Sequence, residues 1–269
     1  MTMNREGGWP LQDNERTATP APCNLRAMFG AVLFDLWETL INDTPERARP
    51  RRAWRSSSVQ TVLRRYDLEA GIDAIEAALD AAGAALSRLH DEGKDLTAGG
   101  RAHVFMTLLE AQAGSKVPDA AAESLEQVIT AMPLDIAPVV APFAVETVAS
   151  IKRRGLATAL VCNTGFTTTP HLLPMLAHYG LSSHLDVMFS DKLGFAKPDT
   201  RIFAAALERI GLPPDRCAFV GDNPHTDIAG AQAAGLFAVQ VGDKHRDGIV
   251  PDARIDDLSQ LAAVLDLPR

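Results

Sequence analysis

Cysteine is scarce in this chain, and long apolar runs are missing. The three cysteines, Cys23, Cys162 and Cys217, lie far apart, and this odd number supports neither a disulfide framework nor a thiolate metal site. No apolar run approaches the roughly 18 residues that a membrane-spanning helix needs, and the N-terminus lacks the apolar segment of a secretory signal. We therefore expect a soluble protein of the cytoplasm, where thiols stay reduced.

Basic charge is also in short supply. Lys and Arg number 26 against 34 Asp and Glu, which gives a formal net charge of −8 and argues against nucleic acid or a membrane as the main partner. The apolar (46%) and charged (22%) fractions of the 269 residues are typical of a globular protein with one large domain or a core plus a smaller domain. Residues 1–27 have no hydrophobic periodicity, and we expect them to form a disordered leader.

A short apolar run that ends in an acid follows this leader. Ala31–Phe34 runs directly into Asp35, which is typical of a buried strand in a parallel sheet. Predicted strands alternate with predicted helices in the C-terminal half, so 28–41 and 138–269 are expected to form a doubly wound α/β core. The further strands are predicted at Leu156–Cys162, Asp186–Ser190, Cys217–Val220 and Phe237–Val241, and the helices at Phe143–Arg154, His171–Tyr179, Thr200–Ile210, Ile228–Ala234 and Asp256–Leu265.

Residues 42–137 differ from the rest because they are rich in Ala, Leu, Glu and Arg and show no strand-like alternation. Apolar residues recur there at helical spacing, as in Val59, Val62, Leu63 and Tyr66. The segment is therefore predicted to be a smaller all-helical domain, inserted directly behind the first strand and well placed to act as a lid.

Polar residues follow the predicted strands at the sheet edge where ligands of open α/β sheets bind. Asp35 follows the first strand, and 162–165 (Cys-Asn-Thr-Gly) ends the second with small donors that can hold phosphate oxygens. Lys197 precedes a helix-opening proline and offers a fixed positive charge. Asp222 and Asp227 share a tight loop after a later strand, and such paired carboxylates suit Mg²⁺.

Each of these groups alone has an ordinary structural explanation, such as helix capping, turn formation or solvation. Their order is more informative: a carboxylate, small polar donors, a lysine and a carboxylate pair at successive strand ends. In this order, and in Val32–Leu40, Gly194–Asp199 and Gly221–Gly235, the chain resembles the haloacid dehalogenase-like (HAD) superfamily. The closest resemblance is to members with a helical cap inserted after the first motif. It implies a HAD-like Rossmannoid core with a cap at 42–137.

By this resemblance, the catalytic residues are Asp35, the nucleophile that takes the transferred group, and Lys197, which stabilises the nucleophile and the phosphoryl oxygens. The residues that correspond to the phosphate-binding second motif are Cys162, Asn163 and Thr164. The family usually has Ser or Thr followed by Asn there, so Thr164 is a candidate for the missing hydroxyl. The implied ligands of a magnesium ion are Asp35, the main-chain carbonyl of Trp37, Asp222 and Asp227.

The departure from the family pattern is Trp37. Family phosphatases carry a second aspartate there, which protonates the leaving oxygen and then activates water, whereas an indole only donates a hydrogen bond. General acid–base catalysis typically contributes about 10² to 10⁴-fold in rate. The adjacent Glu38 would point away from Asp35 on a strand-like backbone. The substitutes that the sequence leaves open are Asp43, His90, His103 and His225.

The reaction class also depends on this position. Dehalogenases of the family carry an aromatic residue there but dispense with the metal and its acidic pair, whereas Asp222 and Asp227 are both present here. Three carboxylates close together without a cation would be electrostatically costly. The leading prediction is a Mg²⁺-dependent phosphohydrolase that acts on a small phosphorylated metabolite through an aspartyl-phosphate on Asp35. The alternatives are a metal-independent hydrolase of the 2-haloacid dehalogenase type and a non-catalytic binding protein.

Arginines are unusually dense at the start of the predicted insert. The cluster comprises Arg47, Arg49, Arg51, Arg52 and Arg55. The ordinary interpretation is a solvated helix face, but one or two of these side chains facing the site would bind a second anionic group of the substrate. His103 and Phe105 are expected to pack within the insert. The sequence specifies neither the substrate nor whether the protein is a monomer or a homodimer.

Overall fold

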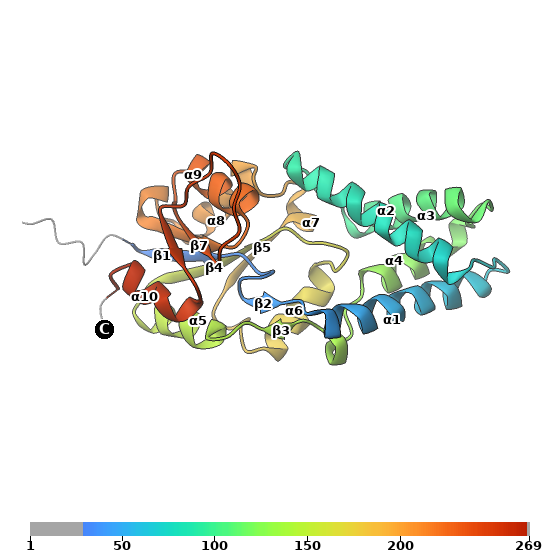
Figure 1. Cartoon of the computed structure of the whole chain (residues 1–269), viewed down its shortest axis with the longest axis horizontal. Helices are drawn as coiled ribbons and strands as arrows, with labels where there is room; N and C mark the ends of the chain where they lie inside the picture. Colours follow the sequence, from blue (N-terminus) through green and yellow to red (C-terminus); the bar gives the residue numbers. More distant parts are fainter. Residues whose placement is uncertain (1–28, 268–269) are drawn as a thin grey trace, which may run out of the picture.

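The computed structural model of the chain describes residues 29–267. The leader expected at residues 1–27, including Cys23, lies outside the described residues. Figure 1 shows an α/β body built around a sheet, with a group of helices extending from one side of it. Among the described residues, no helix has the length and apolar character required to cross a membrane.

A six-stranded sheet forms the centre of the α/β body (Figure 1), in the order β5-β4-β1-β6-β7-β8. The strands are β1 Ala31–Phe34, β4 Ala157–Cys162, β5 Asp186–Phe189, β6 Cys217–Gly221, β7 Phe237–Val241 and β8 Ala253–Ile255. All neighbouring pairs are parallel. The first strand of the chain therefore lies in the middle of the doubly wound sheet that the sequence predicts.

Helices cover both faces of this sheet. They are α5 Ala144–Arg153, α6 Thr169–His178, α7 Ser190–Leu193, α8 Thr200–Ile210, α9 Gly230–Ala233 and α10 Leu261–Val264. Successive residues of a strand point to opposite faces, and β1 supplies both hydrophobic clusters. Val32 and Phe34 join the cluster that contains residues of α5, α6 and α10. Ala31 and Leu33 join the cluster of α8 and α9, which explains why the run must be continuously apolar.

Between β1 and β4 the chain forms a helical insert, with α1 Pro45–Arg64, α2 Ile72–Asp91, α3 Ala98–Ala113 and α4 Ala122–Thr130. Each helix buries apolar residues in a separate hydrophobic cluster, among them Val59, Ile75, Phe105 and Leu125. Two short strands, β2 Ile41–Asn42 and β3 Val139–Val140, pair antiparallel where the chain enters and leaves the insert. The helices lie within the predicted 42–137 segment, and its status as a separate cap domain stays a prediction.

The structure differs from the predicted elements in several places. Strands β2, β3 and β8 were not predicted, because two or three residues are too few to show a periodicity. The helix predicted at Ile228–Ala234 begins earlier, as a π-helix at Pro224–Ala229, because Oδ1 of Asn223 accepts the amide of His225 at 2.9 Å. The predicted closing helix, Asp256–Leu265, is reduced to a 3₁₀ turn at Leu258–Gln260 and the short α10. The remaining 3₁₀ turns are Asp119–Ala121, Leu134–Ile136 and Pro214–Arg216.

Candidate active site

The carboxyl ends of the central strands lie at one edge of the sheet. In the parallel register, Phe34 of β1 is level with Leu160 of β4 and with Val220 of β6. Asp35 follows Phe34 directly, and its amide donates to the carbonyl oxygen of Val220 at 2.8 Å. The residues that follow these strands therefore meet at this edge, where a doubly wound sheet binds its ligands.

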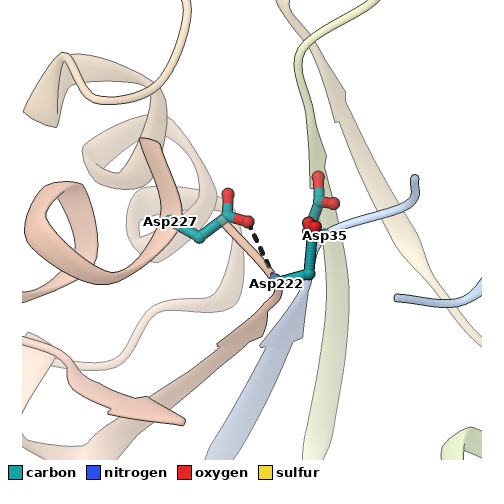
Figure 2. Close-up of side chains that lie close together, drawn as sticks. All are labelled: Asp35, Asp222 and Asp227. Carbon is teal, nitrogen blue, oxygen red and sulfur yellow. Dashed lines mark hydrogen bonds between the residues drawn. The ribbon is translucent and has the colours of Figure 1, made fainter. Parts of the chain in front are cut away.

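Three carboxylates converge at this edge (Figure 2): Asp35 from β1, and Asp222 and Asp227 from the loop and π-helix after β6. One oxygen of each lies within 4.8 Å of the others. The residues are only 5%, 7% and 1% exposed, respectively. Buried carboxylates so close together repel one another unless cations compensate their charge, and hard oxygen donors of this kind suit Mg²⁺.

Lys197 supplies one such cation. Its Nζ lies 2.5 Å from Oδ1 of Asp35 and 2.7 Å from Oδ1 of Asp227. Burial raises the pKa of Asp35 to about 7, and the charges of Asp227 and Asp222 add to this effect, whereas Lys197 opposes it. Burial alone would lower the pKa of Lys197, but the two neighbouring carboxylates hold it above its usual value. Lys197 is therefore a cation in contact with Asp35, whose pKa is raised.

The loop after β6 fixes the two later carboxylates. Oδ2 of Asp227 accepts the backbone amides of Asp222 at 3.1 Å and of Asn223 at 2.9 Å. A Cβ on Gly221 would lie 2.5 Å from that same oxygen, so only glycine allows Asp227 to come this close. Lys244 forms an ion pair with the carboxylate of Asp222. Lys244 is a site residue that the sequence did not indicate, because no motif surrounds it.

The end of β4 places Cys162, Asn163 and Thr164 differently from one another. The Cys162 thiol is fully buried, which raises its pKa well above the usual value. The Asn163 amide exchanges two hydrogen bonds with the backbone of Lys197, at 2.7 and 2.8 Å. The hydroxyl of Thr164 lies within hydrogen-bond distance of buried side chains beyond the cavity, including Ser190 at 3.2 Å. Of the three, only Asn163 lines the cavity, and their role in phosphate binding stays a prediction.

Trp37 lies in a tight turn after β1. The carbonyl oxygen of Leu36 accepts the amides of Leu40 and Ile41, and Glu38 takes a positive φ of 57°. The turn therefore departs from the strand-like backbone on which Glu38 was predicted to point away from Asp35. Both Trp37 and Glu38 line the cavity at the three carboxylates.

That cavity has a volume of about 300 Å³ and contains Asp35, Lys197 and the carboxylate pair together with His90 from α2. A second cavity of about 410 Å³ adjoins it and extends between the insert and the body. The two share Trp37, Ser87, His90 and Asn163. The helical insert thus contributes to the walls of the site through residues of α1 and α2 and through Met132 after α4.

The arginine cluster divides between the surface and the second cavity. Arg49 is exposed, Arg47 donates to the carbonyl oxygen of Asp135, and Arg52 pairs with Glu76 and Asp80 on the insert. Arg51 and Arg55 line the second cavity. Arg51 is ion-paired with Asp43. Burial and the charge of Arg51 lower the pKa of Arg55 to about 10. Nε of Arg55 is buried without a hydrogen-bond partner, whereas its Nη2 donates to the carbonyl oxygen of Ala131 at 3.4 Å.

A buried polar cluster joins the insert to the body behind the cavity. Asp95 and Arg101 form a fully buried ion pair, with Nη2 of Arg101 at 2.7 Å from Oδ1 of Asp95. The same guanidinium donates to the carbonyl oxygen of Thr164 at 2.9 Å, and Ser190 donates to Asp95 at 2.5 Å. The sequence did not indicate this cluster, because Asp95 and Arg101 are far from Thr164 and Ser190 in the chain.

Together, the fold and the site define an α/β protein whose sheet edge holds a buried carboxylate, a buried lysine and a carboxylate pair. A family model described as a haloacid dehalogenase-like hydrolase matches residues 29–235. The chain therefore belongs to the haloacid dehalogenase-like hydrolases, as the strand-end motifs predicted.

Curated relatives match the chain over part of its length. The phosphoserine phosphatase of Thermus thermophilus is 40% identical over 125 residues, which are 45% of this chain and 49% of that protein. The glyceraldehyde 3-phosphate phosphatase of Methanothermobacter thermautotrophicus is 34% identical over 133 residues, 46% of this chain and 58% of that protein. The chain thus spans about half the length of these relatives.

Solved structures match over most of the chain. A 2-haloacid dehalogenase from Pseudomonas syringae has a TM-score of 0.64 at 22% identity and covers 89% of this chain and 99% of its own. A HAD phosphatase from Thermococcus onnurineus has a TM-score of 0.61 at 21% identity and covers 88% and 98%, respectively. These likenesses establish the fold, and because they include both dehalogenase and phosphatase structures, they do not distinguish the two reaction classes.

Proposed function

We propose that the protein is a Mg²⁺-dependent phosphohydrolase that acts on a small phosphorylated metabolite through a phosphoryl group carried by Asp35. The observation that supports this most is the convergence of Asp35, Asp222 and Asp227 at the sheet edge, next to Lys197. A dehalogenation that needs no metal gives no reason to bury three carboxylates together. The phosphatases among the relatives are consistent with the proposal.

Asp35 is the nucleophile in this scheme. One carboxylate oxygen attacks phosphorus, the bond from phosphorus to the leaving oxygen breaks, and water later releases phosphate from Asp35. Lys197 holds the attacking carboxylate in place through its 2.5 Å contact and offers positive charge to the phosphoryl oxygens. Asn163 fixes the backbone of Lys197 by two hydrogen bonds. The site thus orients the nucleophile before a substrate enters.

The residues at the edge fit a magnesium ion. Its proposed direct ligands are Asp35, the carbonyl oxygen of Trp37 and Asp222, and Asp227 lies beside them. Both oxygens of Asp227 are already engaged, one by two backbone amides and the other by Lys197, so Asp227 is better suited to orient the loop than to bind the ion directly. When bound, the ion would neutralise the carboxylates and the phosphate charge.

The substrate of this proposed reaction carries a second anionic group. The guanidinium of Arg55 lines the adjoining cavity, and an anion there would accept hydrogen bonds from it. Apolar side chains such as Leu86 and Phe166 line the same cavity, so the part of the substrate between its two anionic groups need not be polar. We further propose that the helical insert acts as a cap over this substrate.

A phosphatase screen tests the function directly. Purified protein is assayed with phosphorylated metabolites, with and without Mg²⁺, and phosphate release is measured for the wild type and for Asp35→Asn. We expect release that needs Mg²⁺ and disappears in Asp35→Asn. An exposed carboxylate, Asp215, provides the matched control in Asp215→Asn, which should keep wild-type activity. Full activity in Asp35→Asn, or in the presence of a chelator, would refute the mechanism.

The 2-haloacid dehalogenase alternative rests on the aromatic side chain of Trp37, which lines both cavities. Halide release from 2-chloropropionate in the presence of a chelator is the result that would favour it. Thermal stabilisation by phosphorylated compounds, without turnover across the whole panel, would instead select a non-catalytic binding protein.

A further inference from the structure

Because position 37 is a tryptophan, no carboxylic acid stands two residues after Asp35. Among the possible substitutes, Asp43 is ion-paired with Arg51, and His103 is exposed on α3. Neither of them lines the cavity, and His225 does not line it either. Two titratable side chains of the insert line this cavity together with Asp35, the half-buried imidazole of His90 and the exposed carboxylate of Asp91.

His90 lies in the last turn of α2, and its ring contacts Asp95. Nε2 of His90 is buried and lies 3.2 Å from Oδ1 of Asp95, at ion-pair distance but without hydrogen-bond alignment. A carboxylate on one ring nitrogen fixes the imidazole and leaves the other nitrogen available for proton transfer. Imidazole exchanges a proton near neutral pH, which suits a group that must give a proton and then take one.

Asp95 is itself held on several sides. Arg101 contacts both of its carboxylate oxygens, at 2.7 and 2.8 Å, and Ser190 donates to it at 2.5 Å. These partners compensate the charge of Asp95. The carboxylate beside Nε2 of His90 is therefore held in place by groups other than His90.

The loop that carries Asp95 is docked on the segment that leads to Lys197. The amide of Asp95 donates to the carbonyl oxygen of Gly194, and that of Ala196 donates to the carbonyl oxygen of Gly93 at 3.0 Å. Gly93 has a φ of +73°, and a Cβ there would lie 2.8 Å from Cβ of Asp199. This close approach fixes the end of α2, and with it His90, relative to the catalytic lysine.

We infer that His90 is the proton donor and acceptor of the proposed phosphatase reaction, in place of the acid that Trp37 removes. This inference rests on the proposed function. His90 gives its proton to the leaving oxygen as the bond from that oxygen to phosphorus breaks and the bond from Asp35 to phosphorus forms. The neutral imidazole then takes a proton from the water that attacks phosphorus, phosphate leaves, and the carboxylate of Asp35 is restored.

Two model substrates that differ in their leaving group test this role. Phenyl phosphate needs a proton on its leaving oxygen, whereas p-nitrophenyl phosphate releases a stable anion. For each substrate, kcat/KM is measured with Mg²⁺ for the wild type and for His90→Gln. We expect His90→Gln to lose about 10²-fold or more with phenyl phosphate and much less with p-nitrophenyl phosphate. An additional Trp37→Asp substitution should restore part of the activity on phenyl phosphate.

The matched control is His103→Gln, which should keep both activities because His103 is exposed on α3. Equal losses of His90→Gln on both substrates would assign only a structural role and overturn the inference. It would also be overturned if Glu38→Gln or Asp91→Asn, which alter the other acids of the cavity wall, showed the dependence on leaving group instead.

Failure of the proposed function gives a different result. In that case the wild type shows no turnover that depends on Mg²⁺ and on Asp35, and both proposals fall. A wild type whose turnover needs both Mg²⁺ and Asp35, combined with a His90→Gln variant of unchanged leaving-group preference, overturns the inference alone.

Discussion

Nζ of Lys197 lies 2.5 Å from Oδ1 of Asp35, and both side chains are almost completely buried. A cation and a carboxylate in contact under these conditions depend on each other, because removal of one partner leaves the other charge uncompensated. In this site the same ammonium group also contacts Asp227. One lysine therefore supports both the nucleophile and the carboxylate pair.

Replacement of Lys197 by Met should abolish phosphatase activity and lower the free energy of unfolding by about 3 kcal/mol in the absence of metal. Chemical denaturation with and without chelator measures the effect. Lys192 is exposed on α7, so Lys192→Met provides the control and should change stability little. Wild-type stability in metal-free Lys197→Met would show that the carboxylates are compensated by another group.

The raised pKa of Asp35 makes the stability of the metal-free protein depend on pH. The pKa of Asp35 is 3.8 without the folded environment and about 7 in the folded state. Between about pH 4 and about pH 7 the folded state therefore binds a proton at Asp35 that the unfolded state does not bind. The free energy of unfolding must therefore fall as the pH rises from about 4 to about 7. Asp35→Asn abolishes this pH-dependent loss of stability and leaves Lys197 paired with Asp227, so it should be more stable than wild type by about 2 kcal/mol at pH 8.

The comparison needs denaturation curves at pH 4 and pH 8 in chelator, and the advantage of Asp35→Asn should be smaller at pH 4. Added Mg²⁺ at pH 8 should reverse the order by stabilising the wild type. A constant difference between the two proteins across this range would contradict the assigned pKa direction.

Gly221→Ala should displace Asp227, because the new Cβ would lie 2.5 Å from Oδ2 of Asp227 and 2.6 Å from its Cγ. We expect a destabilisation of about 1 to 3 kcal/mol and a weaker rise in Tm on addition of Mg²⁺. A Cβ on Gly71 would meet no atom within 4 Å, so Gly71→Ala is the control for the loss of a glycine. Wild-type Mg²⁺ stabilisation in Gly221→Ala would show that the placement of Asp227 is not required for metal binding.

Arg101→Met should destabilise the protein by about 3 to 5 kcal/mol, because it leaves the buried carboxylate of Asp95 without its main partner. Thermal and chemical denaturation measure the change. Arg88 is exposed on α2, and Arg88→Met should be close to neutral. If Arg101→Met were also neutral, the contact between insert and body would contribute little to stability.

Most of the fold could be predicted from the sequence because the buried strands are continuous apolar runs and the helices end at glycines. The short strands β2 and β8 carry no comparable signal. In the site, Asp35, Lys197, Asp222 and Asp227 follow strand ends, and the sheet topology alone brings them to one edge. Lys244 and the pair of Asp95 and Arg101 could not be predicted, because tertiary contacts rather than local pattern place them there.

The second motif shows the limit of the sequence in another way. Cys162, Asn163 and Thr164 are adjacent, yet only Asn163 lines the cavity. The backbone directs the hydroxyl of Thr164 toward Arg101 and Ser190, which no spacing rule indicates. The sequence also left several residues as candidates for the proton donor. The distance between α2 and the sheet edge depends on how the insert docks, which no local pattern specifies.

The most direct test of the central claim is chemical trapping of the phosphoryl group on Asp35. The protein is incubated with p-nitrophenyl phosphate and Mg²⁺ and treated with borohydride, which reduces an acyl phosphate to an alcohol, and the peptide that contains Asp35 is analysed by mass spectrometry. The account predicts homoserine at position 35 only when both substrate and Mg²⁺ are present. Steady phosphate release with an unmodified Asp35 peptide would contradict it.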